Sequence, residues 1–164
     1  MDAHWHLLTD GSVNTQTKVG YGACLWLQEF TAPTDLLKHT VTVKRFEGTS
    51  STKLELETLI WSLHEHLTSA NKQSTAITVY TDSQNIINLP ERRARLERDD
   101  YFSRNKNQLK HHRLYKVFYS LMDHLHFNLV KVQGHQPSGN CDLIAEHFSL
   151  VDQAARQALR ADTL

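Results

Sequence analysis

Leu7-Leu8-Thr9-Asp10-Gly11-Ser12 is an apolar run that ends on an acid, and a glycine follows at once. We expect residues 4–9 to form a strand that delivers Asp10 at its C-terminal end, with Gly11 allowing a close approach to the backbone. Asp-Gly-Ser is also common turn chemistry and alone would indicate only a turn. A second run, Ile77-Thr78-Val79-Tyr80-Thr81, ends in the same way on Asp82-Ser83. Two strands with this ending predict two carboxylates directed at one metal ion.

The length and composition indicate an ordinary globular protein. A chain of 164 residues fits one domain, which we expect to span 1–164, and 40% hydrophobic and 22% charged residues are typical of such a domain. No apolar run approaches the roughly 20 residues of a membrane helix, and the N-terminus lacks the apolar segment of a signal peptide. Cys24 and Cys141 stand alone, which favours a reducing compartment. We therefore expect a cytoplasmic monomer with no membrane association.

The zero net charge hides an uneven distribution. Residues 91–116 contain nine Lys or Arg against four Asp or Glu, so the remainder of the chain is acidic. A basic segment on an acidic body predicts contact with a polyanion, although a solvated helix face is the alternative. Tyr101 and Phe102, in the same segment, could lie against sugar or base faces.

The pattern of apolar residues predicts the element order βββαβαβα. Strands are expected over 4–9, 20–30, 39–46, 76–81 and 127–132, the first three antiparallel and the fourth parallel to the first. Helical spacing indicates helices over 52–67, 114–125 and 151–161, the first opened by a capping box, Thr52-Lys53-Leu54-Glu55. Pro90 is expected to break the segment after the fourth strand. The fold class is therefore α/β, a five-stranded mixed sheet with helices on its faces.

Five short motifs, in this order along the chain, resemble ribonuclease H of type 1: Asp10-Gly11-Ser12, Leu54-Glu55-Leu56, Thr81-Asp82-Ser83-Gln84, Gly134-His135 and Asp152-Gln153-Ala154-Ala155-Arg156. The resemblance covers nearly the whole chain. It implies an RNase H-like fold and an endonuclease that hydrolyses the RNA strand of RNA–DNA hybrids, leaving 5′-phosphate ends. The residues that it implies as ligands of two Mg²⁺ ions, with Mn²⁺ as a possible substitute, are Asp10, Glu55, Asp82 and Asp152. It also implies that His135 shuttles a proton or helps the product to leave.

The chemistry of the reaction agrees with these residue types. Two hard cations about 3.5–4 Å apart can activate a water molecule and stabilise the leaving oxygen of a phosphodiester. Mg²⁺ prefers oxygen ligands, and a cluster of carboxylates supplies them. Such carboxylates repel one another while no cation is bound, and a histidine titrates in the range useful for proton transfer.

Several of these residues could instead have a purely structural role. Glu55 could act only as a helix cap, Asp152 could mark a helix start with Ser149, and His135 could be an ordinary loop residue. Asp142 is the alternative fourth carboxylate. We choose Asp152 because its motif is the longer match. The motif is also similar to the ending of retroviral and retrotransposon-type domains. The sequence therefore leaves two origins open, a cellular enzyme or a domain of a retroelement polyprotein.

The hybrid is expected to be held mainly through its backbones. Phosphate contacts are blind to sequence and sensitive to salt, whereas RNA is recognised through its 2′-hydroxyls in the minor groove. The residues expected to contact the minor groove are Gly11, Ser12, Ser51, Thr52 and Gln84. Asn85 and residues 49–52 are candidates for binding a phosphate of the DNA strand. Arg92, Arg93 and Arg95 are candidates for binding other phosphates.

Two further hypotheses compete with this one. Three His-x-His pairs, His4/His6, His64/His66 and His124/His126, could bind zinc, but no third ligand is evident and side chains two apart on a helix diverge. The protein could also be another nuclease of the same fold, acting on DNA or structured RNA, or a catalytically silent hybrid-binding module. The four acids argue against a silent module, because a protein that only binds the hybrid gains no affinity from negative charges that face its phosphates.

Overall fold

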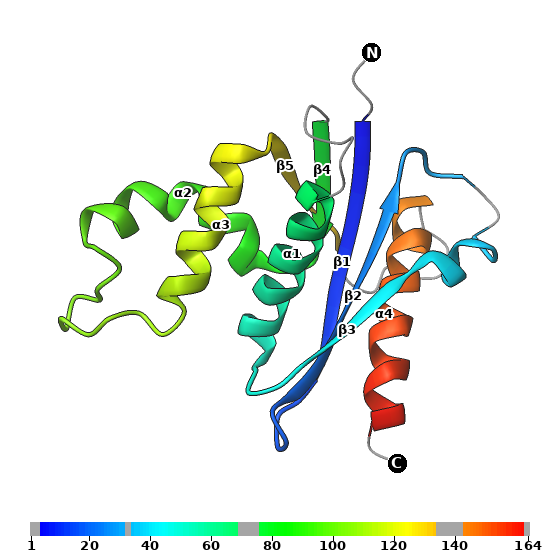
Figure 1. The fold of residues 1–164 in the computed structure, drawn as a ribbon, viewed down its shortest axis with the longest axis horizontal. Helices are drawn as coiled ribbons and strands as arrows, with labels where there is room; N and C mark the ends of the chain where they lie inside the picture. The colour runs from blue at the N-terminus through cyan, green and yellow to red at the C-terminus, as the bar shows by residue number, and fades with distance from the viewer. Residues whose placement is uncertain (1–3, 32–33, 69–75, 134–142, 163–164) are drawn as a thin grey trace.

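The computed structural model describes residues 4–31, 34–68, 76–133 and 143–162, which form a mixed sheet with helices against both faces (Figure 1). The strands are β1 (His4–Asn14), β2 (Val19–Leu27), β3 (Thr42–Phe46), β4 (Ala76–Thr81) and β5 (Phe127–Lys131). Their order across the sheet is β3-β2-β1-β4-β5. The pairs β1–β2 and β2–β3 are antiparallel, and β1–β4 and β4–β5 are parallel. The predicted sheet is confirmed.

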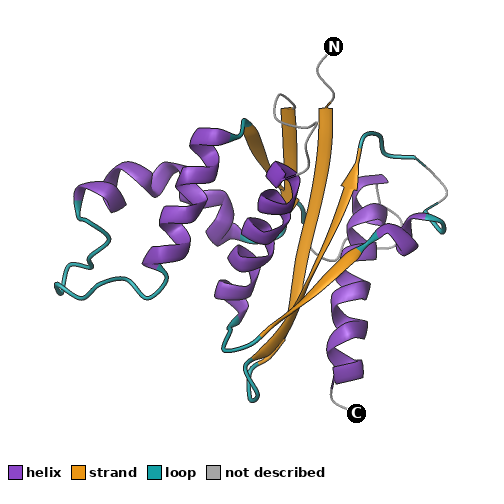
Figure 2. Cartoon of the chain, in the orientation of Figure 1, coloured by secondary structure: helices purple, strands orange, loops and turns teal. Residues whose placement is uncertain are grey.

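The helices divide between the two faces of the sheet (Figures 1 and 2). Helices α1 (Ser51–Thr68), α2 (Gln84–Arg98) and α3 (His112–His124) share one apolar core with the sheet, and α4 (Leu143–Asp162) builds a second core against the other face. A short 3₁₀ helix, η1 (Leu37–Thr40), precedes β3. Within the described ranges, no helix is both long enough and apolar enough to cross a membrane.

Glycines in β1 and β2 let α1 lie unusually close to the sheet. A Cβ added at Gly22 would stand 2.1 Å from Thr58 Oγ1, and one at Gly11 would stand 2.8 Å from Leu54 Cδ2. Real Cβ atoms do not approach other atoms so closely, so a side chain at Gly22 would push Thr58 and α1 outward, and one at Gly11 would displace the Leu54 side chain. The absence of side chains at these two positions therefore fixes how near Glu55, on α1, comes to β1.

The first strand is longer than expected. β1 continues past Thr9 to Asn14, because its antiparallel pairing with β2 goes on through Asp10↔Ala23 and Gly11↔Gly22. Gly11 is consequently part of a strand and not of a turn. The parallel pairing with β4 stops earlier, at Leu8↔Tyr80. Asp10 therefore lies within β1, at the point where that strand has lost one of its two neighbours.

The predicted capping box is wrong, because α1 begins at Ser51 and the hydroxyl of Ser50 accepts the N–H of Lys53 at 3.3 Å. The predicted break at Pro90 is also wrong, since α2 runs through it. Helix α2 is absent from the predicted order, which becomes βββαβααβα. The other differences concern boundaries: β2 ends at Leu27, η1 replaces the start of the third predicted strand, β5 ends at Lys131, α3 begins at His112 and α4 begins at Leu143.

Packing explains why α2 remains helical through Pro90. A proline inside a helix removes one hydrogen bond and costs about 3 kcal/mol. Ile86, Leu89 and Leu96 of α2 are buried in the core beneath α3, and each such side chain contributes about 1.5–3 kcal/mol. The buried hydroxyl of Tyr119 also donates to the Leu89 carbonyl at 2.7 Å, which ties α3 to α2. The apolar burial outweighs the local cost.

Candidate active site

Four acids from four separate elements meet at one edge of the fold. Asp10 lies on β1, Glu55 on α1, Asp82 directly after β4, and Asp152 within α4. Continuing the parallel register of Leu8↔Tyr80 by two residues places Asp10 beside Asp82. The Asp10 and Asp152 side chains share a hydrogen bond, and the charges of Glu55 and Asp82 interact. The structure thus brings together the four acids that the sequence singled out.

The acids are under electrostatic strain. Asp10 is 9% exposed. Burial, and then repulsion from Asp82 and Asp152, raises its pKa to about 8, against the opposing effect of the Gly11 N–H. Burial is likewise the main cause that raises the pKa of Glu55 and of Asp82. A cluster of this kind is stabilised by a cation, which offsets the repulsion and lowers the raised pKa values again.

Two of the acids do not have the purely structural role that the sequence also allowed. Ser83 caps α2, since its hydroxyl oxygen accepts the N–H of Ile86 at 3.3 Å, and the same hydroxyl donates to Glu55. Glu55 is therefore held by the turn that follows β4 and does not cap α1. Asp152 lies in the middle of α4 and so does not mark a helix start. His135 and the alternative acid Asp142 fall outside the described residues.

The donor set of the four acids fits a hard divalent cation. Carboxylate oxygens suit Mg²⁺ or Mn²⁺ and do not favour soft metals. In the part of the chain that the structure describes, no group of three or more His, Cys, Asp or Glu, the four acids included, is already arranged with metal-binding geometry, so the case for the acids rests on their chemistry and convergence. The pair His4/His6 is engaged otherwise: His4 Nε2 lies 2.8 Å from Thr78 Oγ1, and His6 Nδ1 lies 3.0 Å from the Tyr80 hydroxyl. The four acids are therefore the better candidate metal centre.

Two cations flank the acids, and the sequence reasoning gave neither of them a role. Arg156 Nε lies 3.0 Å from Asp152 Oδ1, one helical turn away on α4. The four-residue spacing of Asp152 and Arg156 in the sequence could have indicated this ion pair. Lys131 pairs in register with Thr81 at the end of β5, and its charge lowers the pKa of neighbouring Asp82. Only the register of two parallel strands shows that Lys131 belongs to this site.

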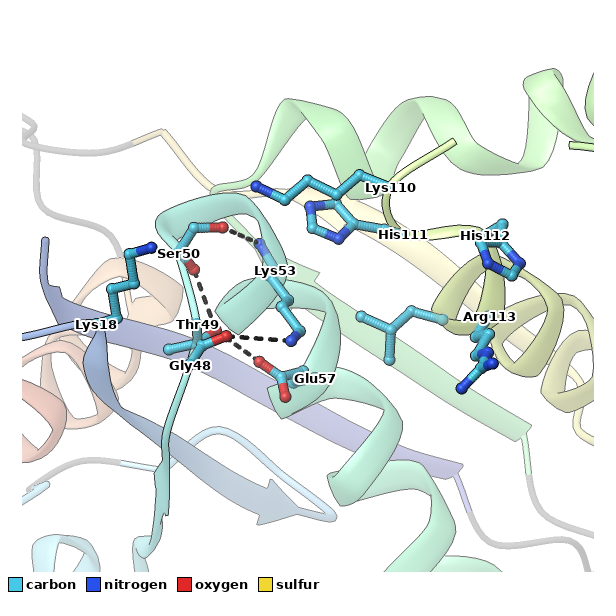
Figure 3. Close-up of a pocket in the computed structure, with 11 residues that line it drawn as sticks. Lys18, Gly48, Thr49, Ser50, Lys53, Glu57, Lys110, His111, His112 and Arg113 are labelled. Carbon is cyan, nitrogen blue, oxygen red and sulfur yellow. Dashed lines mark hydrogen bonds between the residues drawn. The ribbon is translucent and has the colours of Figure 1, made fainter. Parts of the chain in front are cut away.

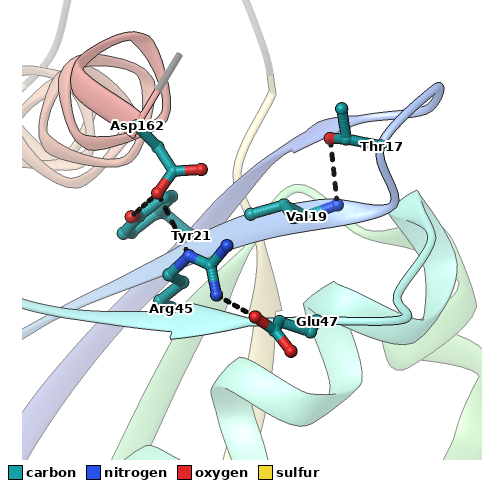
Figure 4. Close-up of polar contacts among 6 residues, drawn as sticks. All are labelled: Thr17, Val19, Tyr21, Arg45, Glu47 and Asp162. Carbon is teal, nitrogen blue, oxygen red and sulfur yellow. Dashed lines mark hydrogen bonds and ion pairs between the residues drawn. The ribbon is translucent and has the colours of Figure 1, made fainter. Parts of the chain in front are cut away.

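A polar clamp at the C-terminal end of α4 positions the helix that carries Asp152 (Figure 4). The Tyr21 hydroxyl donates to Asp162 Oδ1 at 2.8 Å, and Arg45 Nε donates to the same oxygen at 3.1 Å. Arg45 also pairs with Glu47. These contacts lower the pKa of Asp162, the hydrogen bond from Tyr21 contributing most. The clamp joins β2 and β3 to α4 and so helps to fix the height of α4 above the sheet.

A groove of about 730 Å³ opens beside the first turns of α1, where that helix approaches α3 (Figure 3). The residues that line it are Lys18, Gly48, Thr49, Ser50, Lys53, Glu57, Lys110, His111, His112, Arg113 and Leu114. Its cationic side chains outnumber its one carboxylate, that of Glu57, which accepts a hydrogen bond from Thr49 at 2.6 Å. The pKa of His111 is lowered by burial and by Lys110 and Lys53. The groove is therefore suited to an anion.

The other predicted substrate residues lie in different places. Gly11 and Ser12 follow Asp10 on β1, Gln84 starts α2 beside Asp82, and Ser51 and Thr52 are exposed on the first turn of α1. Farther along α2, Arg92 donates a hydrogen bond to Asn85 at 3.4 Å, and Arg95 is exposed. Arg93 forms a two-pronged ion pair with Asp123, with both N–O distances 2.8 Å. Arg93 thus joins α2 to α3.

The geometry agrees with what comparison with known proteins finds. The family model described as RNase H matches residues 2–160. The chain belongs to the RNase H family. The solution structure of the PFV RNase H domain has the same fold as this RNase H chain, with a TM-score of 0.70 and 15% sequence identity over 93% of this chain and 92% of that one. A search of curated proteins gives no match. RNase H proteins typically use divalent metal ions.

Proposed function

We propose that this RNase H chain is an endonuclease that hydrolyses the RNA strand of RNA–DNA hybrids and leaves 5′-phosphate ends. Two Mg²⁺ ions, which Mn²⁺ can replace, would be held by Asp10, Glu55, Asp82 and Asp152. The observation that carries the proposal is the convergence of these acids around a buried Asp10 whose pKa is about 8. Acids forced together at a cost in stability are typical of a functional site.

The chain's own residues prepare the reaction. Bound divalent cations would supply an activated water and relieve the charge on the leaving 3′-oxygen. Asp10 interacts with both Asp82 and Asp152, so once ionised it could hold a divalent cation together with either of them. Ser83 holds the Glu55 carboxylate by a hydrogen bond, so this ligand is oriented before substrate arrives. The role of His135 as a proton shuttle stays a prediction.

The basic groove supplies a place for the second strand of the hybrid. Helix α1 carries Glu55 toward the acids, whereas Lys53 and Glu57, two residues to either side, line the groove. With the RNA strand at the acids, the groove would receive phosphates of the DNA strand, near Thr49 and the predicted residues Ser51 and Thr52. Gly11, Ser12 and Gln84 lie next to the acids and would contact 2′-hydroxyls, which distinguish RNA from DNA.

The loop between α2 and α3 extends the basic surface away from the sheet (Figure 2). Phe102, on this loop, is 41% exposed, and Arg104 and Lys106 lie near it around a shallow pocket. An exposed aromatic ring among cations suits the sugar–phosphate backbone of a nucleic acid. We assign this loop and the exposed Arg95 to contacts with phosphates, and Arg93 chiefly to the packing of α2 on α3.

The test is cleavage of a labelled RNA–DNA hybrid with Mg²⁺, with the same RNA alone, double-stranded RNA and double-stranded DNA as other substrates. We expect cleavage of the RNA in the hybrid only, and none with EDTA. Asp10→Asn should abolish cleavage and retain hybrid binding. Asp35→Asn, which neutralises an exposed acid just ahead of η1, is the matched control and should cut normally.

Each other outcome has a defined meaning. Cleavage of double-stranded DNA or RNA in place of the hybrid would assign the chain to another nuclease activity on the same fold. Salt-dependent binding of the hybrid without cleavage would make it a silent binding module. Cleavage that persists in Asp10→Asn would remove Asp10 from the mechanism.

A further inference from the structure

Lys131 is the last residue of β5 and lies at the rim of the acids. It pairs with Thr81, the residue before Asp82, and the Val132 N–H donates to the Thr81 carbonyl at 2.8 Å, so β5 is held against β4 up to this point. The ammonium group of Lys131 donates to Gln84 Oε1 at 2.6 Å. Gln84 in turn donates through Nε2 to Asn88 Oδ1 at 2.8 Å. A chain of hydrogen bonds thus holds the Lys131 cation beside Asp82.

This placement has a local cost. The start of α2 carries the positive end of the helix dipole, where acids are favourable and cations are not. The first turn of α2 contains no acid, and the negative charge beside Lys131 is that of Asp82, just before the helix. The side chain is exposed, and an ammonium group has three donors, of which Gln84 takes one. A cation that is held in position beside a cluster of acids and keeps unused donors is suited to binding an anionic ligand there.

We propose that Lys131 binds a phosphate oxygen of the RNA strand next to Asp82, with Gln84 holding its side chain in position. The inference rests on the proposed function, because it places the RNA strand at the acids. Asp82, Asp10 and Asp152 repel a phosphate, and Lys131 offsets this repulsion at the side where β5 ends. Its positive charge also opposes the entry of divalent cations. Removal of Lys131 should therefore weaken the binding of RNA and strengthen the binding of Mg²⁺.

The opposite signs of these two effects define the experiment. Three variants are compared with the wild type: Lys131→Met, which removes the charge, Lys131→Arg, which keeps it, and Lys44→Met, which removes an exposed lysine from β3 at the other edge of the sheet. Mg²⁺ binding is measured by calorimetry without nucleic acid. Hybrid affinity is measured against salt concentration with Ca²⁺ in place of Mg²⁺, and cleavage is measured under single-turnover conditions.

We expect Lys131→Met to bind the hybrid about tenfold more weakly and to cut it correspondingly more slowly. The slope of log affinity against log salt should fall by about one. The affinity for Mg²⁺ should rise about threefold. Lys131→Arg should stay within about twofold of the wild type for the hybrid, and Lys44→Met should match the wild type in every measurement.

Three results would overturn the assignment. Unchanged hybrid affinity and salt slope in Lys131→Met would show that Lys131 does not contact phosphate. Equal loss in Lys44→Met would reduce the effect to general surface charge. Joint loss of hybrid and Mg²⁺ affinity, together with a lower melting temperature, would mark Lys131 as merely structural. A wild-type protein that binds the hybrid but cuts nothing refutes the proposed function instead, and the affinity measurements then still decide the role of Lys131.

Discussion

Replacement of Asp10 by asparagine should make the metal-free protein more stable. Asparagine has nearly the shape of aspartate, and it can still hydrogen-bond to Asp152, but it carries no charge. In the folded wild type the pKa of Asp10 is raised from 3.8 to about 8. The folded state therefore binds the Asp10 proton more tightly than the unfolded state does. The contribution of Asp10 to wild-type stability is consequently greatest below the unfolded pKa and falls as the pH rises through the folded one.

The magnitude follows from this pKa. At pH 7 the unfolded chain has lost the proton of Asp10, and pH 7 lies about 3 above the unfolded pKa. At about 1.4 kcal/mol for each pH unit, the cost to the folded state is about 4 kcal/mol. Part of this cost is recovered if the protein relaxes, so we expect Asp10→Asn to gain about 2–4 kcal/mol. For a domain of this size that is a rise in melting temperature of about 5–15 °C.

The assay is urea denaturation in EDTA at pH 5, 7 and 8. The gain from Asp10→Asn should grow from pH 5 to pH 8, because the wild type alone loses stability over that range. Mg²⁺ should stabilise the wild type and have a much smaller effect on the variant. Asp123→Asn is the control of opposite sign: Arg93 lowers the pKa of this exposed acid, so removing its charge should not stabilise the protein.

Two results would refute this reasoning. If Asp10→Asn were no more stable than the wild type at pH 7 in EDTA, the acids would not be strained. If the gain were equal at pH 5 and at pH 8, it would not arise from the ionisation of Asp10. Either result would also remove the observation on which the proposed metal centre depends.

Three further predictions concern the framework. Gly22→Ala should lose about 1–3 kcal/mol in urea denaturation, with a larger loss of activity, because its Cβ would meet Thr58 at 2.1 Å and push α1 outward; unchanged activity would contradict this. Asp162→Asn should lower the melting temperature at pH 7 but not at acidic pH. An acid whose pKa is lowered in the folded state contributes its full stability only above its ordinary pKa, and this contribution is lost as the pH falls through the lowered pKa. Arg93→Ala should lower the melting temperature, whereas Arg95→Ala should leave it unchanged and reduce only the salt dependence of hybrid binding; the reverse pattern would reassign both arginines.

Local patterns in the sequence were sufficient for the five strands, three of the four α-helices and the fold class, but they missed α2. Alternating and helical spacing of apolar residues depend on neighbours within a few positions, and these patterns predicted all five strands. The same local reasoning failed at Pro90, where the penalty for a helical proline is smaller than the apolar burial of α2. It also ended β1 too early at Gly11, because the pairing partner that extends the strand, β2, is a separate segment.

The sequence by itself determined which acids were available, and the tertiary structure decided which of them meet. Asp10 and Asp82 were predictable as a pair because each follows an apolar run in the sequence. The contact of Asp10 with Asp152 requires α4 to be set against β1 at one height, which the clamp at Asp162 helps to impose. Lys131 and the basic groove were not predictable, since each is assembled from segments far apart in the chain. Strand register and helix packing are long-range properties, so they place charges that local patterns cannot.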